Sequence, residues 1–215
     1  MASEATETPY NPLDKVHLAE SVGRALLERP VGPLPPSRQF AGAGIYAIYY
    51  LGSFEPYAPI TQANRSGRFE LPIYVGKAIP TGGRKGAANS VDAPPPGPEL
   101  VRRLTEHARS IEEGENLVGD HFLCRHLVVD DVWIALAERL LVHRFQPLWN
   151  VVVDGFGNHD PGQGRHGQRR SPWDVLHPGR PWAARLRESK TDLETVLATV
   201  SAHLRGPSYF SPLLF

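Results

Sequence analysis

The chain has 215 residues, 41% of them hydrophobic, which is the size and composition of one domain with extensions or of two small domains. Its 23 basic residues balance 23 acidic residues, which disfavours non-specific binding of polyanions but is compatible with a specific DNA-binding face. The single cysteine, Cys124, excludes an intramolecular disulfide and a cysteine-rich zinc site, and the lack of a membrane-length apolar run or a signal peptide predicts a soluble cytoplasmic protein.

The first half of the chain alternates between predicted helix and strand. Asn11-Pro12 is a favourable helix start, and hydrophobic residues recur at helical spacing until Pro30 ends the run. Strands are predicted at 44–51, from its β-branched and aromatic residues, and at 72–76, which a glycine terminates. A polar stretch at 52–71 lies between these strands, and a loop rich in glycine and proline is predicted at 80–98.

The second half is mainly helical. We predict helices at 99–113, 131–145 and about 192–204, a strand at 122–129 and a loop-rich region at 150–182. This order predicts an α+β fold, with a small mixed or antiparallel sheet of about three core strands and helices packed on it. We divide the chain into an N-terminal tail and helix (1–41), a central module (42–151) and a C-terminal extension (152–215), all within one compact unit.

Two polar residues lie at the edge of the apolar stripe on the 99–113 helix. Arg103 and His107 are four residues apart, so they share one face of the helix. A cation and an imidazole at a core boundary are costly unless they have partners, which makes both residues candidates for a functional site. Taken alone, the pattern favours the simpler interpretation of a snorkelling arginine and a hydrogen-bonded core histidine.

The 131–145 helix carries one acidic residue, Glu138, beside a broad apolar face. Its neighbours three and four positions away are all apolar, so no ion pair within the helix is available. A carboxylate in this place requires a partner from outside, such as a metal ion or an arginine on another element. A surface glutamate at the edge of the stripe is an equally good interpretation of this pattern alone.

The order of these residues resembles the GIY-YIG nuclease superfamily. Gly44-Ile45-Tyr46 and Tyr74-Val75-Gly76 are similar to the two strand motifs that name it, and they are followed in order by Arg103, Glu138 and Asn150. Each motif is weak by itself, but the ordered set over 42–151 is specific. The enlarged spacer between the tyrosines, and further matches at 41–44, 71–78, 106–107, 147–159, 173–175 and 177–180, resemble the type II restriction endonucleases that cut CCGCGG.

The resemblance implies single-metal hydrolysis of a DNA phosphodiester that leaves a 5′-phosphate. Glu138 is then the metal ligand for Mg²⁺, with Mn²⁺ as a substitute, because one carboxylate plus water suits that ion. Tyr46 is the implied general base, and we expect His107 and Arg103 to lower its pKa towards neutrality. The sequence leaves open whether Tyr46 or His107 finally takes the proton.

The resemblance also gives the remaining site residues their roles. Arg103 would bind the scissile phosphate, and Tyr74 would hold the attacking water or a phosphate oxygen. Lys77 would add positive charge, and Asn150 would orient Glu138 or donate to a phosphate.

Sequence-specific cleavage also implies double-stranded DNA as partner, a homodimer that matches a palindromic site, and a cognate DNA methyltransferase in the same system. The dimer interface is expected at the helix near 12–29 or in the 52–71 spacer. We expect DNA contacts from this spacer, from the 80–98 loop and from a glycine-rich segment, for which a solvated surface loop is the alternative. Its candidate residues, chosen because arginine reads guanine bidentately, are Arg165, His166, Arg169 and Arg170.

Two other functions stay open. The first is a GIY-YIG nuclease of repair or of mobile elements, which the lack of a separate second DNA-binding domain disfavours. The second is a DNA-binding module without catalysis, which the joint presence of all the motif residues disfavours. The segment 157–160 superficially resembles an HNH nuclease motif, but the rest of that motif is missing.

Overall fold

A four-stranded antiparallel sheet in the order β1-β4-β2-β3 forms the centre of the computed structural model, which describes residues 11–65, 67–80, 97–160 and 167–206. The strands are β1 (Gly32–Pro33), β2 (Gly44–Tyr50), β3 (Tyr74–Ala78) and β4 (Phe122–Val128). The three longer strands confirm the predicted α+β sheet. The two-residue β1, which pairs with Leu123 and Cys124, is an addition that no sequence pattern indicated.

The two faces of β2 bury different side chains, because successive residues of a strand point to opposite sides. Ile45, Ala47 and Tyr49 belong to one hydrophobic cluster, whereas Tyr46 and Ile48 belong to the other. All seven residues of β2 are buried, since the sheet is covered on both faces. Tyr46 is therefore fixed on a definite side of the sheet.

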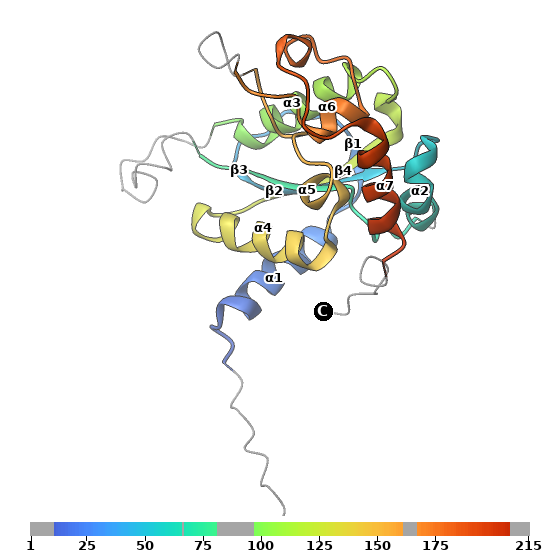
Figure 1. The fold of residues 1–215 in the computed structure, drawn as a ribbon. Helices are drawn as coiled ribbons and strands as arrows, with labels where there is room; N and C mark the ends of the chain where they lie inside the picture. The colour runs from blue at the N-terminus through green and yellow to red at the C-terminus, as the bar shows by residue number, and fades with distance from the viewer. Residues whose placement is uncertain (1–10, 66, 81–96, 161–166, 207–215) are drawn as a thin grey trace, which may run out of the picture.

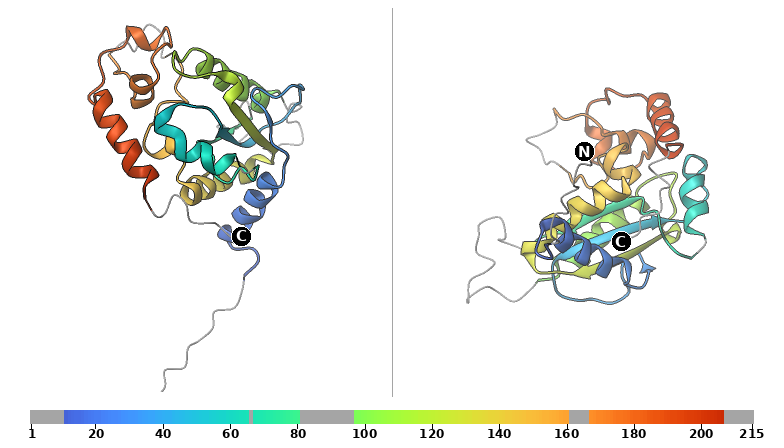
Figure 2. Two further views of the ribbon diagram at one scale, coloured as in Figure 1. Left: turned by 90° about the vertical axis from the view of Figure 1, so that its right-hand side faces the viewer. Right: turned by 90° about the horizontal axis from the view of Figure 1, so that it is seen from below.

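Helices cover both faces of the sheet (Figure 1). On the Tyr49 side lie α1 (Lys15–Leu27) and α4 (Asp131–Phe145), which pack against each other and are seen over the sheet in the right-hand view of Figure 2. On the Tyr46 side lie α3 (Glu99–Glu112) and the short α5 (Leu148–Val151). The predicted helices at 99–113 and 131–145 are confirmed to within a residue.

The spacer between β2 and β3 is partly helical, so its interpretation as a plain polar stretch was wrong. It contains η1 (Glu55–Tyr57) and α2 (Ala58–Asn64). Asn64 is fully buried, and its side chain donates to the carbonyls of Tyr50 and Leu71 and accepts from the amide of Leu71. These bonds hold the spacer at the end of β2. A helix of seven residues depends on such long-range contacts for its stability, so its local sequence does not predict it.

The C-terminal extension packs into the same core as the central module. It contains α6 (Pro172–Leu176), η6 (Ala183–Arg185) and α7 (Leu193–Leu204), and α6 and α7 contact each other (Figure 2). Trp173 and Val200 belong to one hydrophobic cluster with Tyr46 and Leu104.

The short helix η4 (Gly119–His121) connects α3 to β4 and completes the described elements. None of the described helices combines the length and apolar character that crossing a bilayer requires.

Candidate active site

The two motif tyrosines lie side by side on neighbouring strands. In the β2–β3 register Tyr46 stands opposite Gly76, and Ile48 opposite Tyr74. The ring centroids of Tyr46 and Tyr74 are 6.2 Å apart. A Cβ atom at position 76 would overlap the hydroxyl group of Tyr46, so the glycine of the second motif leaves room for the first tyrosine.

His107 is buried beneath these rings. It is 1% exposed, and its Nε2 lies 2.5 Å from the phenolic oxygen of Tyr46. Phe156 stacks on its imidazole at a centroid distance of 4.5 Å and an interplanar angle of 17°. Burial, together with the nearby Arg103, lowers the pKa of His107 well below its usual value, so the imidazole is neutral near pH 7. The sequence placed His107 at the border of the apolar stripe, whereas the structure places it inside.

The expectation that His107 and Arg103 bring the pKa of Tyr46 down towards neutrality is wrong. Burial, followed by the proximity of Tyr74, raises the pKa of Tyr46 well above its ordinary value, although Arg103 acts in the opposite direction. Burial likewise raises the pKa of Tyr74. Both phenols are therefore protonated near pH 7, because desolvation of a phenolate outweighs its attraction to one guanidinium.

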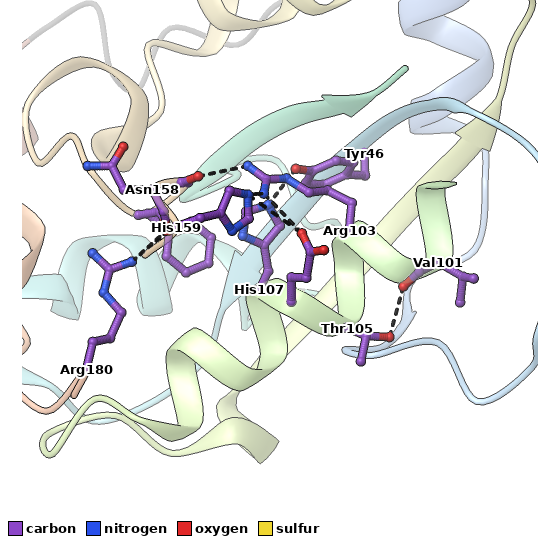
Figure 3. Close-up of polar contacts among 11 residues, drawn as sticks. Tyr46, Val101, Arg103, Thr105, His107, Asn158, His159 and Arg180 are labelled. Atoms are coloured by element: carbon purple, nitrogen blue, oxygen red, sulfur yellow. Dashed lines mark hydrogen bonds and ion pairs between the residues drawn. The ribbon is translucent and has the colours of Figure 1, made fainter. Parts of the chain in front are cut away.

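Arg103 lies at the edge of this aromatic cluster, between Tyr46 and the turn that carries Asn158 and His159 (Figure 3). Its Nη2 donates to the carbonyl of Gly157 at 3.0 Å, and its Nη1 donates to a carboxylate oxygen of Glu106 at 3.2 Å. The same Nη1 contacts Nε2 of His159. Arg103 is thus held by the backbone of Gly157 and by the side chains of Glu106 and His159.

Glu138 has the outside partner that its apolar surroundings require. The ammonium group of Lys77, on β3, forms an ion pair with Glu138, on α4. The side chain of Glu138 is 20% exposed and that of Lys77 is 36% exposed, so the pair is accessible from solvent. The sequence predicted a partner from another element, such as a metal ion or an arginine, and in the structure this partner is a lysine.

Asn150 does not contact Glu138, which corrects the expected role of orienting that carboxylate. Its Oδ1 accepts from the amide of Val75 at 2.8 Å, and its Nδ2 donates to the carbonyl of Val75 at 2.8 Å. β3 is an edge strand, so these two bonds replace a missing neighbour directly after Tyr74. The asparagine therefore fixes the strand that carries Tyr74 and Lys77.

The proposed DNA-reading segment is only partly within the described residues. Arg165 and His166, and most of the 80–98 loop, lie outside them. Arg169 donates to the carbonyl of Glu188 at 3.0 Å, and the backbone of Arg170 bonds to the carbonyl of Arg187. This end of the segment is therefore paired with residues 187–188.

Sequence reasoning gave no site role to Glu106, Phe156, Gly157 or His159, which surround Arg103 and His107. Three of them belong to the turn at 155–159, which the sequence placed in a loop-rich region. Gly155 has a positive φ of 104°, and a Cβ there would overlap Ser171. The sequence feature that could have indicated this part of the site is the glycine-rich run at 155–159, which contains an aromatic residue and a histidine.

A protein-family model described as the Eco29kI GIY-YIG domain matches residues 38–204. The chain belongs to this family. It is therefore a GIY-YIG restriction endonuclease, a hydrolase whose substrate is DNA. The match extends beyond 42–151 into the C-terminal extension, so the turn at 155–159 and α6 are part of the Eco29kI-type domain. No curated protein matches the chain.

GIY-YIG nucleases use divalent metal ions, and the surroundings of Glu138 fit such an ion. Within the described ranges, no three His, Cys, Asp or Glu side chains come together as a metal cluster. An ion at Glu138 would thus have one protein carboxylate, with its other positions left to water and substrate. This donor set suits Mg²⁺, which retains much of its hydration, better than it suits Zn²⁺.

Proposed function

We propose that this Eco29kI-type protein is a type II restriction endonuclease that cuts double-stranded DNA at a GC-rich palindrome, CCGCGG, and leaves 5′-phosphates. The observation that carries the proposal is the buried hydrogen bond between Tyr46 and His107, with Arg103 beside it. This arrangement places a proton acceptor, the Tyr46–His107 pair, beside a cation that can bind phosphate, Arg103, on one side of the sheet. Lys77 on β3 and Glu138 on α4 come from the other face of the sheet, but Glu138 is close enough that, in addition to burial, its charge helps to raise the pKa of both Tyr46 and Tyr74.

Tyr46 acts as general base through His107 in this proposal. A water molecule gives a proton to the phenolic oxygen while Tyr46 passes its own proton to Nε2 of His107. Because the pKa of Tyr46 is raised, this relay avoids a free phenolate in the resting site. The water oxygen forms a bond to phosphorus, the bond from phosphorus to the 3′-oxygen breaks, and solvent protonates the leaving oxygen. His107 then returns its proton through Tyr46 to solvent, because burial and Arg103 disfavour the protonated imidazole.

Arg103 binds the scissile phosphate, and Tyr74 positions the attacking water. Preorganised cations of this kind are worth most in a site sheltered from water, as the burial of Tyr46 and His107 indicates here. Glu138 would hold Mg²⁺, or Mn²⁺ in its place, which neutralises charge on the phosphoryl and leaving oxygens. Asn150 fixes β3 at Val75, between Tyr74 on the Tyr46 face of the sheet and Lys77 on the opposite face.

Sequence recognition is proposed to come from the 52–71 spacer, the 80–98 loop and the segment with Arg165, His166, Arg169 and Arg170. A palindrome is matched by a two-fold homodimer, which we propose as the active form, with a cognate methyltransferase protecting the host site. We propose three units, 1–41, 42–151 and 152–215, that together form one functional body.

The direct test is cleavage of plasmid DNA by the purified protein with Mg²⁺ or Mn²⁺, followed by sequencing of the ends. Discrete fragments with 5′-phosphates at one palindrome support the proposal, and Glu138→Gln should abolish them. Cutting at junctions or lesions would instead indicate a repair or mobile-element nuclease. DNA binding with no cleavage in either metal would indicate a DNA-binding module. Light scattering with cognate DNA tests the dimer, and a monomer contradicts it.

A further inference from the structure

Arg180 is a buried cation outside the residues that the proposed chemistry uses. It is 1% exposed, and Asp174 on α6 balances its charge at 2.7 Å. The guanidinium lies over the rings of Trp173 and Trp182, at 4.3 and 4.6 Å from their centroids. Burying a charge is costly, so a cation enclosed in this way requires a compensating set of bonds.

Those bonds go to the turn that borders the active site. Arg180 donates to the carbonyls of Gly155 at 3.0 Å, Phe156 at 3.2 Å and Asn158 at 3.4 Å. Three carbonyls of one five-residue turn thus converge on a single side chain. Figure 3 shows Arg180 on the side of the turn opposite Arg103.

The other side of the turn contacts the catalytic candidates. The carbonyl of Gly157 accepts from Arg103, and His159 contacts the same guanidinium. Phe156 stacks on His107 and meets the ring of Tyr74 edge-on at 5.0 Å. The turn therefore connects Arg180 to the residues that would bind the phosphate and accept the proton.

We propose that Arg180 is a positioning residue, which sets the orientation of Arg103 and His107 through the 155–159 turn. Arginine suits this role because its planar fork donates several bonds in fixed directions, whereas a lysine ammonium is a compact charge without that geometry. Asp174 is itself held by the hydroxyl of Ser171 at 2.6 Å, at the start of α6. The C-terminal extension thereby orients a site whose chemistry lies in the central module.

The test is Arg180→Lys, which keeps the charge opposite Asp174 but loses the fork. We expect kcat for DNA cleavage to fall by about tenfold to a hundredfold with KM changed less than about threefold, because small misplacement of a positioned group costs rate. The matched control is Arg205→Lys at the exposed end of α7, which should leave both constants unchanged. The comparison is made at a temperature where thermal unfolding shows all variants to be folded.

A second readout does not require activity. The ring resonances of His107 should shift in Arg180→Lys, because Phe156 stacks on that ring, and should not shift in Arg205→Lys. Unchanged His107 resonances with unchanged kcat would overturn the proposal and leave Arg180 as a purely structural residue. If Arg180→Lys fails to fold, Gly157→Ala decides, since its Cβ would lie 3.0 Å from the Tyr74 hydroxyl and 3.2 Å from Arg103.

For Gly157→Ala, a folded protein with full activity and unmoved His107 resonances would overturn the link between the turn and the site. The kinetic part of this inference rests on the proposed nuclease function, which the wild-type protein tests separately. A wild type that cuts DNA alongside an unaffected Arg180→Lys refutes only the positioning role. A wild type that never cuts, with His107 resonances moved in Arg180→Lys, refutes the function and keeps the positioning.

Discussion

The phenolic oxygen of Tyr46 lies 2.5 Å from Nε2 of His107, and the two residues are 61 positions apart in the chain. Tyr46 comes from the central strand and His107 from α3, and both are buried. If burial were the only observation, this hydrogen-bonded pair would be interpreted as a structural part of the core. Its position beside Arg103 is what makes it a candidate for proton transfer.

Removing the hydroxyl of Tyr46 should strongly slow cleavage, and it should also destabilise the fold by about 1–3 kcal/mol, because Nε2 of His107 loses its buried partner. Tyr46→Phe should lower the rate by about 10²- to 10⁴-fold, the range for loss of a general base. Single-turnover cleavage of plasmid DNA measures this. The control is Tyr49→Phe, which removes the same group from the opposite face of β2 and should cut DNA normally. Near-normal cleavage by Tyr46→Phe would refute the assignment of the base.

Acid should destabilise the protein through His107 and His177, which are the buried histidines of the part of the chain that the structure describes. Burial, and secondarily Arg180, lowers the pKa of His177 from 6.5 to about 3, and burial lowers that of His107 in the same direction. As pH falls below 6.5 the unfolded chain binds protons that the folded protein excludes. The contribution of each such histidine to stability is therefore fully present above about pH 6.5. Below that pH, the free energy of unfolding falls by about 1.4 kcal/mol per pH unit for each of them.

Urea unfolding between pH 7 and pH 4 measures this slope. His177→Gln should reduce it, because one of the two groups no longer titrates on unfolding. The control, His143→Gln, changes an exposed residue on α4 and should leave the slope as in the wild type. A stability that is independent of pH in this range contradicts the prediction.

Lys77 should compete with a metal ion for Glu138. Lys77→Met removes the ion pair, and a partly exposed pair is worth at most about 1 kcal/mol, so Mn²⁺ should bind about two- to fivefold more tightly. Cleavage should nevertheless fall, because a positive charge near the phosphate is lost. Electron paramagnetic resonance of free Mn²⁺ gives the affinity, with Lys190→Met at an exposed site as control. Weaker Mn²⁺ binding by Lys77→Met would argue against Glu138 as the ligand.

Tyr57 is expected to be important for stability rather than for catalysis. Its hydroxyl accepts from Nε1 of Trp149 at 2.8 Å and donates to Nε2 of His177 at 2.6 Å. The direction follows because an indole only donates and Nδ1 of His177 bonds to the amide oxygen of Asn116. Tyr57→Phe leaves two buried polar atoms without this partner, which should cost about 2–4 kcal/mol.

Urea unfolding at pH 7 checks the loss in Tyr57→Phe. At temperatures where the variant is folded, its cleavage rate should be close to that of the wild type, because the hydroxyl of Tyr57 bonds to Trp149 and His177, which have no role in the proposed chemistry. A destabilisation below about 0.5 kcal/mol, which is the size expected for an ordinary surface substitution, would show that the bonds of Tyr57 to Trp149 and His177 do not stabilise the fold.

Local patterns in the sequence predicted the three main strands and the main helices, because each carries strong periodicity and clear end signals. The α+β fold, the two tyrosine motifs and the positions of Arg103, His107 and Glu138 follow from these patterns with the family resemblance. Short elements such as β1, α2 and α6 escaped prediction, because two to seven residues carry too little periodicity and are stabilised by long-range contacts.

The sequence by itself determined which residue types are present and the order in which they occur along the chain. Only the tertiary structure decided that Lys77 pairs with Glu138, that Asn150 bonds to Val75, and that the 155–159 turn closes on Arg103. It also decided that Tyr46 is buried deeply enough to raise its pKa instead of lowering it. The physical reason is that desolvation and ion pairing depend on what surrounds a group in space, which no spacing along the chain specifies.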